Sequence, residues 1–367
     1  MINRSILIVT HSFYPQNSPR SFRATELAKE FSRQGHKVTV LTIKNEKIHR
    51  EFEIVNKLEI KDLGKRKWVS PSFGNTKLGT LFTRAFYRLL SLSLEYPDIE
   101  LMFMVRKALR KEMNYDLLIS NAVPYPVHWG VAAARKKNHQ ISKVWVADCG
   151  DPYMGERTDS FRKWFYFSKV EKWFMRKTDY ISIPVETAKD GYYPEFHHKL
   201  KIIPQGFKFD PIQGSKNYVS NGIPTFAYAG GFIPGLRDPR QFMDYLSNVD
   251  IQFKFIVYTN TPALIDEYKV KLYGKLDVRE YIPREDLLKT LNEMDFLVNF
   301  DNNTSVQVPS KLIDYALTGR PILNIRSPLE PAAIDQFLKG DYSAKYVVDD
   351  IQKYNIENVV RQFLELL

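Results

Sequence analysis

Short apolar runs alternate with helix-length amphipathic segments along most of this chain. The run at residues 5–10 (SILIVT) is typical of a strand buried on both faces, and a loop, an amphipathic helical pattern and a second run at 38–41 follow it. Strand, helix and strand at this spacing form a βαβ unit, which predicts a doubly wound parallel sheet. Similar runs recur at 116–120, 143–147 and 180–184.

A second alternation follows a polar stretch at 210–222 that is rich in Gly, Ser, Asn and Pro. Its predicted strands are 225–229, 252–258, 296–299 and 321–325, and its predicted helices are 239–247, 262–273, 284–294 and 311–318. We therefore predict an α/β protein with two Rossmann-like domains, 1–208 and 209–350, facing a cleft. We expect the final helix, 351–367, to pack back on the first domain.

Composition and charge limit the compartment and the partners that the protein can have. The 367 residues include a single cysteine, Cys149, which excludes an internal disulfide framework and fits a reducing compartment. Residues 1–200 hold 34 basic and 21 acidic residues, whereas the rest of the chain is nearly neutral. The first domain is therefore expected to face an anionic partner: a membrane surface, a phosphorylated lipid or a nucleic acid. The first apolar run has the length of a strand and not of a signal peptide, which favours a cytoplasmic location.

Polar groups concentrate where the predicted helix near residue 311 begins. Pro309 suits a first helical turn and Gly319 a helix end, so the free backbone N–H groups of this helix offer a seat for phosphate. Ser310 and Lys311 would add a hydroxyl and a cation, or only a helix cap and a solvated lysine. Asp314 can accept hydrogen bonds from a sugar, or simply complement the helix dipole.

The loop after the predicted strand 225–229 offers a second phosphate contact. Gly230 and Gly231 permit close approach of the backbone to a ligand, although a Gly pair also simply makes a turn. Arg237 follows, just before a helix, and a guanidinium fork matches phosphate oxygens. Its alternative is an ordinary surface arginine.

Three residues of the first domain stand at predicted loop ends on the carboxyl side of the sheet. Arg20 and Arg23 would meet a donor phosphate or an acceptor, or would be exposed arginines behind a helix cap at Ser18 or Ser21. Asp151 would bind a sugar hydroxyl, or cap a helix.

Two segments of the first domain combine aromatic and basic residues. Residues 77–90 place apolar side chains on one helical face and basic ones on another, and residues 161–177 alternate Trp and Phe with Arg and Lys. This pattern is typical of helices at a membrane interface, and also of core-packing helices with a solvated basic face. The charge of the whole domain favours membrane contact. The sequence has no zinc-ligand cluster, Walker loop or complete Gly-x-Gly-x-x-Gly motif, so no metal and no cofactor are expected.

Over nearly its whole length the chain resembles the GT-B glycosyltransferases, and it is most similar to glycosyltransferase family 4. The resemblance rests on residues 6–41 with Gly35-His36, on 202–206 (IIPQG), on 228–231 (YAGG) and on 308–322. It implies the GT-B fold and transfer of a sugar from a nucleotide-sugar donor, usually with retention and without a metal. The departing phosphate would take the proton of the acceptor hydroxyl. Members that act on polysaccharide precursors often sit on the inner membrane surface.

The chain departs from the family pattern at several positions. The family's Glu-x7-Glu motif falls on Val306 and Asp314, so the resemblance gives Asp314 the ribose and leaves the donor sugar without its usual partner. The Arg expected beside Gly230-Gly231 is absent, which moves the diphosphate role to Arg237, with Arg240 in reserve. Lys311 joins Arg237 as the predicted catalytic pair, and Tyr281 is placed at the nucleotide base. A family His near the end of the fourth strand is replaced by the sequence around Asp148.

The predicted function is therefore sugar transfer to a lipid-linked glycan in polysaccharide or lipopolysaccharide synthesis, at the inner face of the plasma membrane. The partners are the nucleotide-sugar, the lipid-linked acceptor and an anionic membrane, with no nucleic acid expected. One alternative is a nucleotide-sugar 2-epimerase of the same fold, which would need no lipid. Another, suggested by Val306 and the missing His, is a non-catalytic subunit that binds a glycan or a partner protein. The positive charge of the first domain suggests a third alternative, a protein that binds nucleic acid.

Overall fold

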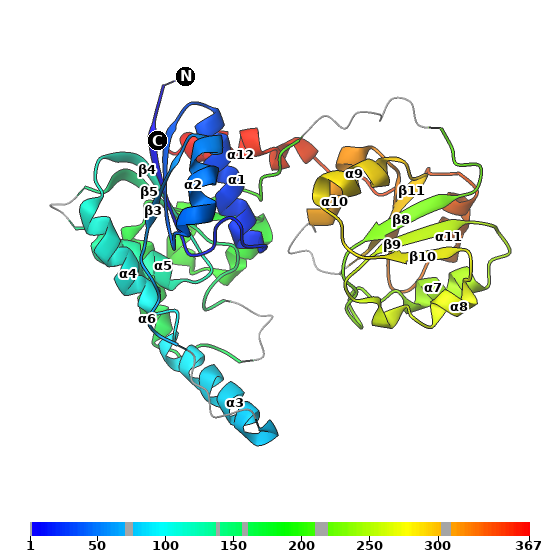
Figure 1. Cartoon of the computed structure of the whole chain (residues 1–367), viewed down its shortest axis with the longest axis horizontal. Coiled ribbons are helices and arrows are strands. Elements are labelled where there is room, and N and C mark those ends of the chain that lie inside the picture. Colours follow the sequence, from blue (N-terminus) through cyan, green and yellow to red (C-terminus); the bar gives the residue numbers. More distant parts are fainter. Residues whose placement is uncertain (1, 70–75, 137–139, 156–160, 210–218, 302–309) are drawn as a thin grey trace. The chain divides into compact units, whose positions relative to one another are not determined.

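The computed structural model describes residues 2–69, 76–136, 140–155, 161–209, 219–301 and 310–367. The chain forms two compact units, one of Met1–Lys208 with Lys353–Leu367 and one of Phe209–Gln352. Each unit is a parallel sheet with helices on both faces, so the predicted α/β fold is confirmed (Figure 1). In the described part of the chain, every helix is too short or too polar to cross a lipid bilayer.

The described residues of the first unit form a seven-stranded sheet of order β3-β2-β1-β4-β5-β6-β7, parallel throughout. The strands are β1 (Ser5–Thr10), β2 (Lys37–Thr42), β3 (Glu59–Asp62), β4 (Tyr115–Asn121), β5 (Ser142–Asp148), β6 (Tyr180–Ile183) and β7 (Leu200–Ile202). The strand order reverses between β1 and β4. The loops after these two strands therefore diverge at the place where such folds bind ligands.

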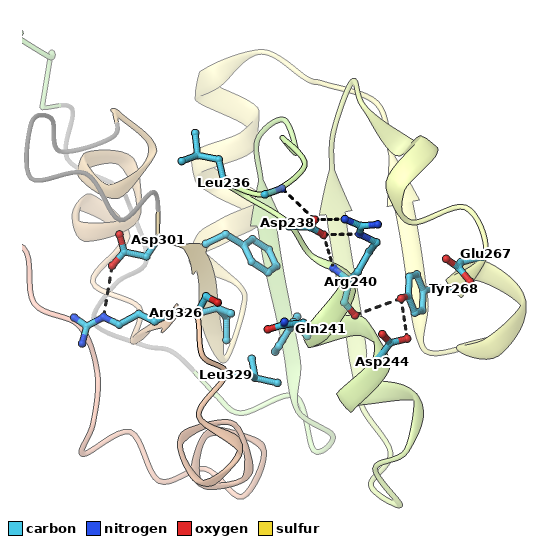
Figure 2. A pocket seen from close by; sticks show the side chains of 15 residues that line it. Leu236, Asp238, Arg240, Gln241, Asp244, Glu267, Tyr268, Asp301, Arg326 and Leu329 are labelled. Atoms are coloured by element: carbon cyan, nitrogen blue, oxygen red, sulfur yellow. Dashed lines mark hydrogen bonds and ion pairs between the residues drawn. The ribbon is translucent and has the colours of Figure 1, made fainter. Parts of the chain in front are cut away.

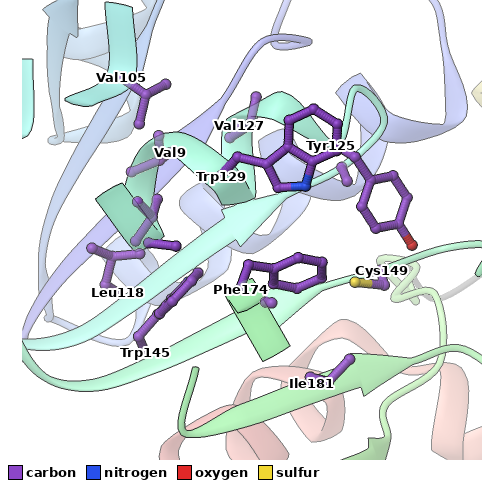
Figure 3. Packing of buried hydrophobic residues seen from close by; sticks show 14 of the residues in the cluster. Val9, Val105, Leu118, Tyr125, Val127, Trp129, Trp145, Cys149, Phe174 and Ile181 are labelled. Atoms are coloured by element: carbon purple, nitrogen blue, oxygen red, sulfur yellow. The ribbon is translucent and has the colours of Figure 1, made fainter. Parts of the chain in front are cut away.

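Helices cover both faces of this sheet because its strands are apolar on both sides. On β1, Ile6 and Ile8 face one core while Leu7 and Val9 face the other, and all four are fully buried. The first core is completed by α1 (Pro19–Arg33), α2 (Glu46–Asn56) and α12 (Ile356–Leu364). The second is completed by α4 (Glu100–Ala108), α5 (Pro126–Ala134) and α6 (Phe167–Lys177), and Figure 3 shows part of its packing.

The C-terminal helix α12 belongs to the first unit. Its buried residues, among them Val359, Val360 and Phe363, pack with α1, where the rings of Phe31 and Phe363 lie 6.5 Å apart. Each such side chain stabilises the unit by roughly 1.5–3 kcal/mol. A 3₁₀ turn, Ile351–Tyr354, precedes the helix, so regular α-helix begins at Ile356.

The described residues of the second unit form a five-stranded parallel sheet of order β10-β9-β8-β11-β12. Its strands are β8 (Thr225–Ala229), β9 (Lys254–Tyr258), β10 (Leu276–Arg279), β11 (Phe296–Phe300) and β12 (Ile322–Ile325). One face is covered by α7 (Arg240–Ser247), α8 (Tyr268–Lys271) and α11 (Pro331–Leu338), and the other by α9 (Arg284–Asn292) and α10 (Ser310–Thr318). Here the order reverses between β8 and β11.

Three predicted helices differ from the structure. The segment predicted as a helix at 262–273 contains a 3₁₀ turn, Pro262–Leu264, and the single turn of α8. Ile265, Tyr268 and Leu272 are buried as the apolar spacing predicts, but two short turns achieve this as well as one helix. Residues 161–166 precede α6 and are not part of it. The helix predicted at 77–90 extends further, as α3 (Lys77–Leu94).

Candidate functional site

Two tyrosines join the end of β8 to α10. The hydroxyl of Tyr315 accepts the N–H of Ala229 at 2.8 Å, and the hydroxyl of Tyr228 donates to the carbonyl of Gly231 at 3.0 Å. Gly230 has φ +156°, and a Cβ there would lie only 2.9 Å from the Tyr228 hydroxyl, so glycine is needed. Sequence reasoning missed both tyrosines, because each stands in an apolar run that predicts only core packing.

Lys311 lies one turn before Tyr315 and over the ring of Tyr228. Its Nζ donates to the Tyr228 hydroxyl at 3.4 Å and is 4.5 Å from the ring centroid. Burial, together with the nearby charge of Arg237, lowers the pKa of Lys311 to about 7. Within the described residues no carboxylate forms an ion pair with this lysine. The charge of Asp301 opposes this lowering of the pKa without forming an ion pair, so Lys311 is a partly buried cation that is only weakly compensated by the described residues.

Arg237 is held by a tight turn of the loop after β8. Its backbone N–H donates to the carbonyl of Ile233 at 2.9 Å. The Nε of its side chain is buried and has no hydrogen-bond partner among the described residues. Burial raises the pKa of Tyr228 and Tyr281, and the charge of Arg237 opposes both rises, which places the guanidinium near both rings.

Tyr281 and Gly231 meet on the same side of the sheet. A Cβ at Gly231 would lie 3.9 Å from the Tyr281 hydroxyl, and the ring itself is 52% exposed. The next residue, Phe232, donates its N–H to the hydroxyl of Thr261 at 2.7 Å. The loops after β8, β9 and β10 therefore converge around an exposed tyrosine and two cations.

One carboxylate oxygen of Asp314 is hydrogen-bonded to Arg284, a residue that the sequence analysis did not indicate. Its Oδ1 accepts from Nε of Arg284 at 2.9 Å and from Nη2 at 2.6 Å. Burial raises the pKa of Asp314, and Arg284 opposes this rise. The other carboxylate oxygen, Oδ2, has no partner among the described residues. Binding of the ribose hydroxyls by Asp314 stays a prediction, and Oδ2 is the oxygen that would accept their hydrogen bonds.

Arg240, the predicted reserve for Arg237, points elsewhere. Its Nε and Nη2 donate to Asp238 at 2.9 and 2.5 Å. Both residues line a pocket of about 540 Å³ at the carboxyl ends of β11 and β12, with Asp244, Tyr268 and Arg326 (Figure 2). Arg237, Tyr281, Lys311 and Asp314 do not line this pocket. Arg240 is therefore not part of the cluster that Arg237 and Lys311 form.

In the first unit, Arg23 is neither exposed nor available, unlike both interpretations of the sequence. Its guanidinium donates to both oxygens of Asp148, at 2.6 and 2.7 Å, and to the carbonyls of Ile203 and Pro204. The side chain is only 4% exposed. Burial would raise the pKa of Asp148, but Arg23 and the Ser182 hydroxyl hold it below its usual range. We correct the prediction: Arg23 is a structural residue that ties α1 to β5.

Arg20 and Asp151 are brought together and remain partly accessible. Arg20 Nη2 lies 3.5 Å from Asp151 Oδ2, with side chains 21% and 46% exposed. A Cβ at Gly150 would fall 0.9 Å from that guanidinium nitrogen, so a larger residue there would displace the guanidinium of Arg20 from this position. The main chain of Asp151 is fixed by Tyr125, whose hydroxyl donates to its carbonyl at 2.5 Å. Their acceptor role stays a prediction.

Part of the predicted phosphate seat lies outside the described residues. The structure does not describe Val306 and Pro309. Of Ser310, the first residue of α10, it describes only the backbone. No group of three potential metal ligands occurs in the described part of the chain. What the second unit presents is a pair of cations with neutral tyrosines beside the first turn of a helix, which is an arrangement suited to a phosphate or diphosphate.

Comparison with solved structures identifies the fold. The chain is similar to TarM (9% identity, TM-score 0.61, 99% of this chain and 98% of that one). It is also similar to a glycosyltransferase from Rickettsia africae (10%, 0.58, 99% and 94%) and to the lipopolysaccharide outer core galactosyltransferase WaaB (12%, 0.56, 99% and 98%). These likenesses define a GT-B glycosyltransferase fold.

Sequence comparison then gives the family. Residues 22–210 match the family described as Glycosyltransferase Family 4. The chain belongs to this family and is a glycosyltransferase of the GT-B type, as the sequence motifs predicted. No curated protein matches it by sequence.

Proposed function

We propose that this protein transfers a sugar, with retention, from a nucleotide-diphospho-sugar to a lipid-linked glycan of polysaccharide or lipopolysaccharide synthesis, at the inner face of the plasma membrane. The observation that carries the proposal is the cation pair of Arg237 and Lys311, which forms no ion pair with an acidic residue among those described. A mutant of TarM has been solved with Fondaparinux, alpha-GlcNAc-glycerol and UDP, which supports a UDP-type donor for this fold.

In the proposed reaction the bond from the anomeric carbon to the phosphate oxygen breaks while the acceptor oxygen bonds to that carbon. The departing phosphate takes the acceptor proton, so no separate base is required. Arg237 and Lys311 stabilise the charge that develops on the diphosphate. Before the reaction, Tyr228 holds Lys311 and is itself fixed by Gly231, while the backbone of Arg237 is fixed by Ile233. Asp314 holds the ribose and Tyr281 meets the base. The second unit thus binds the donor, and Arg20 and Asp151 of the first unit face the acceptor.

A donor panel tests this proposal. The purified protein is incubated with UDP-, GDP-, ADP- and CMP-sugars, with and without a bacterial lipid extract, and both the nucleotide and the sugar products are followed. We expect one donor to release its nucleotide only when lipid is present, with the sugar recovered on the lipid. Lys311→Met and Arg237→Gln should each lower that rate at least about tenfold.

The control variant is Lys289→Met, which removes an exposed lysine from α9 in the same unit and should leave the rate unchanged. Conversion of a nucleotide-sugar to its epimer without lipid would support the epimerase instead. Absence of both donor use and nucleotide binding would leave the non-catalytic subunit.

A further inference from the structure

The helix α3 differs from the helices that build the core of the first unit. Among its described side chains none is buried, although the helix is 18 residues long. At 1.5 Å per residue it is about 27 Å long. Figure 1 shows it extending away from the body of the first unit.

One side of α3 is apolar. Leu78, Leu81, Phe82, Phe86 and Leu89 recur at helical spacing and are all exposed, Leu81 by 63% and Phe82 by 61%. A shallow groove of about 400 Å³ lies along the N-terminal half of this stripe, between Thr76 and Phe86. An apolar stripe of this length facing water indicates an interaction surface.

The segment 161–166 extends the same surface. It contacts the C-terminal half of α3, where Trp164 donates its backbone N–H to the Leu92 carbonyl at 3.3 Å and Arg88 lies over the Phe161 ring at 5.5 Å. Phe161, Trp164 and Phe165 are nonetheless exposed, Phe165 by 78%. Aromatic side chains thus stand beside the apolar stripe, as they do where proteins meet lipid headgroups.

The charges around this surface select its partner. Residues 77–94 contain no Asp or Glu, and Arg84 falls beside the apolar stripe at helical spacing. Arg162 in the neighbouring segment is also exposed. A second copy of the chain would bring like charges together across a two-fold contact, whereas an anionic bilayer would compensate them.

We propose that α3 together with residues 161–166, which we call the α3 surface, docks on an anionic lipid bilayer with α3 lying in the plane of the interface. The apolar stripe would enter the boundary between headgroups and acyl chains to a depth of roughly 5–10 Å, and the arginines would contact lipid phosphates. This inference rests on the proposed function in one respect: the lipid-linked acceptor is expected in the same membrane. Docking itself requires no donor and no turnover.

Vesicle flotation of the whole protein tests the proposal. Vesicles of phosphatidylcholine alone are compared with vesicles that also contain phosphatidylglycerol. We expect wild-type protein to float with the mixed vesicles and to be released by added salt. The double variant Leu81→Ser, Phe82→Ser should bind at least about tenfold more weakly to the mixed vesicles. Arg84→Gln with Arg162→Gln should also weaken that binding about tenfold.

Matched variants control for general effects. Ile54 and Val55 are an adjacent apolar pair on α2 that is 72% and 71% exposed, so their double change to Ser removes a similar apolar area elsewhere on the first unit. Arg110→Gln with Lys111→Gln removes two exposed charges outside the α3 surface. Both controls should bind vesicles within about twofold of wild type.

The proposal is overturned if wild-type protein does not float with either kind of vesicle, or if the α3 variants float as well as the two controls. A wild-type dimer that the Leu81, Phe82 variant converts to a monomer, without vesicle binding, would assign the surface to a second copy. Thermal shifts with nucleotides, measured on the same samples, keep this result separate from the proposed function. Vesicle binding without any nucleotide binding would sink the donor site and leave the α3 surface standing.

Discussion

Both units have cations near the carboxyl ends of their sheets, but the units differ in whether a carboxylate pairs with these cations. In the first unit, Arg23 is matched by both oxygens of Asp148, and Asn121 and Ser182 complete the hydrogen bonds of that carboxylate. In the second unit, Lys311 and Arg237 lie close together with no such partner among the described residues. The paired cation of the first unit serves structure, whereas we propose that the two cations of the second unit bind a ligand.

The difference follows from the balance between desolvation and pairing. A buried cation with a bidentate carboxylate keeps its charge and fixes the elements that it joins. A buried cation without one is disfavoured by burial, and an incoming anion relieves that penalty, so ligand binding and stability become linked. The cation pair of the second unit is therefore expected to respond to a diphosphate, and Arg23 is not.

The largest expected effect is at the paired site. Arg23→Met would leave Asp148 buried without its cation and should lower the free energy of unfolding by about 3–5 kcal/mol. Urea denaturation measures this, with Arg33→Met as the control, because Arg33 is 56% exposed in its ion pair with Glu30. The control should cost at most about 1 kcal/mol. Equal losses in the two variants would contradict a special role for the Arg23 pair.

Lys311→Met should behave in the opposite way. It removes a buried charge that is unpaired within the described residues, so the stability of the free protein should not fall. The affinity for the donor nucleotide should decrease about 10- to 100-fold, the range expected when a charged hydrogen bond worth about 1.5–3 kcal/mol is lost. A variant that unfolds more easily and binds nucleotide normally would show that Lys311 is structural.

The pKa of Lys311 gives a test with a definite sign. In the folded chain it is about 7, lowered by burial and by Arg237, whereas an unfolded lysine titrates near about 10.4. Between these values the unfolded state binds more protons, so stability of the free protein should rise with pH in this window. Urea denaturation at several pH values should show this rise, and Lys311→Met should flatten it. A profile that Lys311→Met leaves unchanged would contradict a lowered pKa of Lys311 in the folded protein.

The smallest effect is expected at Arg240. This arginine is exposed and already paired with Asp238, so Arg240→Gln should change stability by no more than about 1 kcal/mol and nucleotide affinity by less than about twofold. Titration with the same nucleotide measures the affinity of Arg240→Gln and of Lys311→Met for direct comparison. A loss as large as that of Lys311→Met would return Arg240 to the donor site.

The fold could be predicted because the central strands are buried on both faces. Runs such as Ile6–Val9 in β1 need apolar residues at every position, and such runs are visible in a sequence. The edge strands β3 and β10 were not predicted, since they are short and carry charges such as Glu59 and Arg279. Their register comes from pairing with a neighbour and not from their own pattern.

The candidate site was predictable only where local motifs mark it. The Gly pair, Arg237 and Lys311 stand next to strand and helix ends, which sequence patterns locate. The contacts of Tyr315 with Ala229 and of Lys311 with Tyr228 join residues that are distant in sequence, and so do the ion pairs of Arg23 and Asp314. These residues meet only when the sheets form. No periodicity distinguishes Arg23, which is buried, from Arg20, which is partly exposed.

The most direct test of the account is calorimetric titration of UDP, GDP, ADP and CMP into the wild-type protein and into Lys311→Met, Arg237→Gln and Lys289→Met. We predict that at least one nucleotide binds the wild type and Lys289→Met equally, and that its Kd rises at least about tenfold in each of the other two variants. Equal binding by all four proteins would contradict the claim that the unpaired cations of the second unit form the donor site. So would a wild-type protein that binds none of the nucleotides.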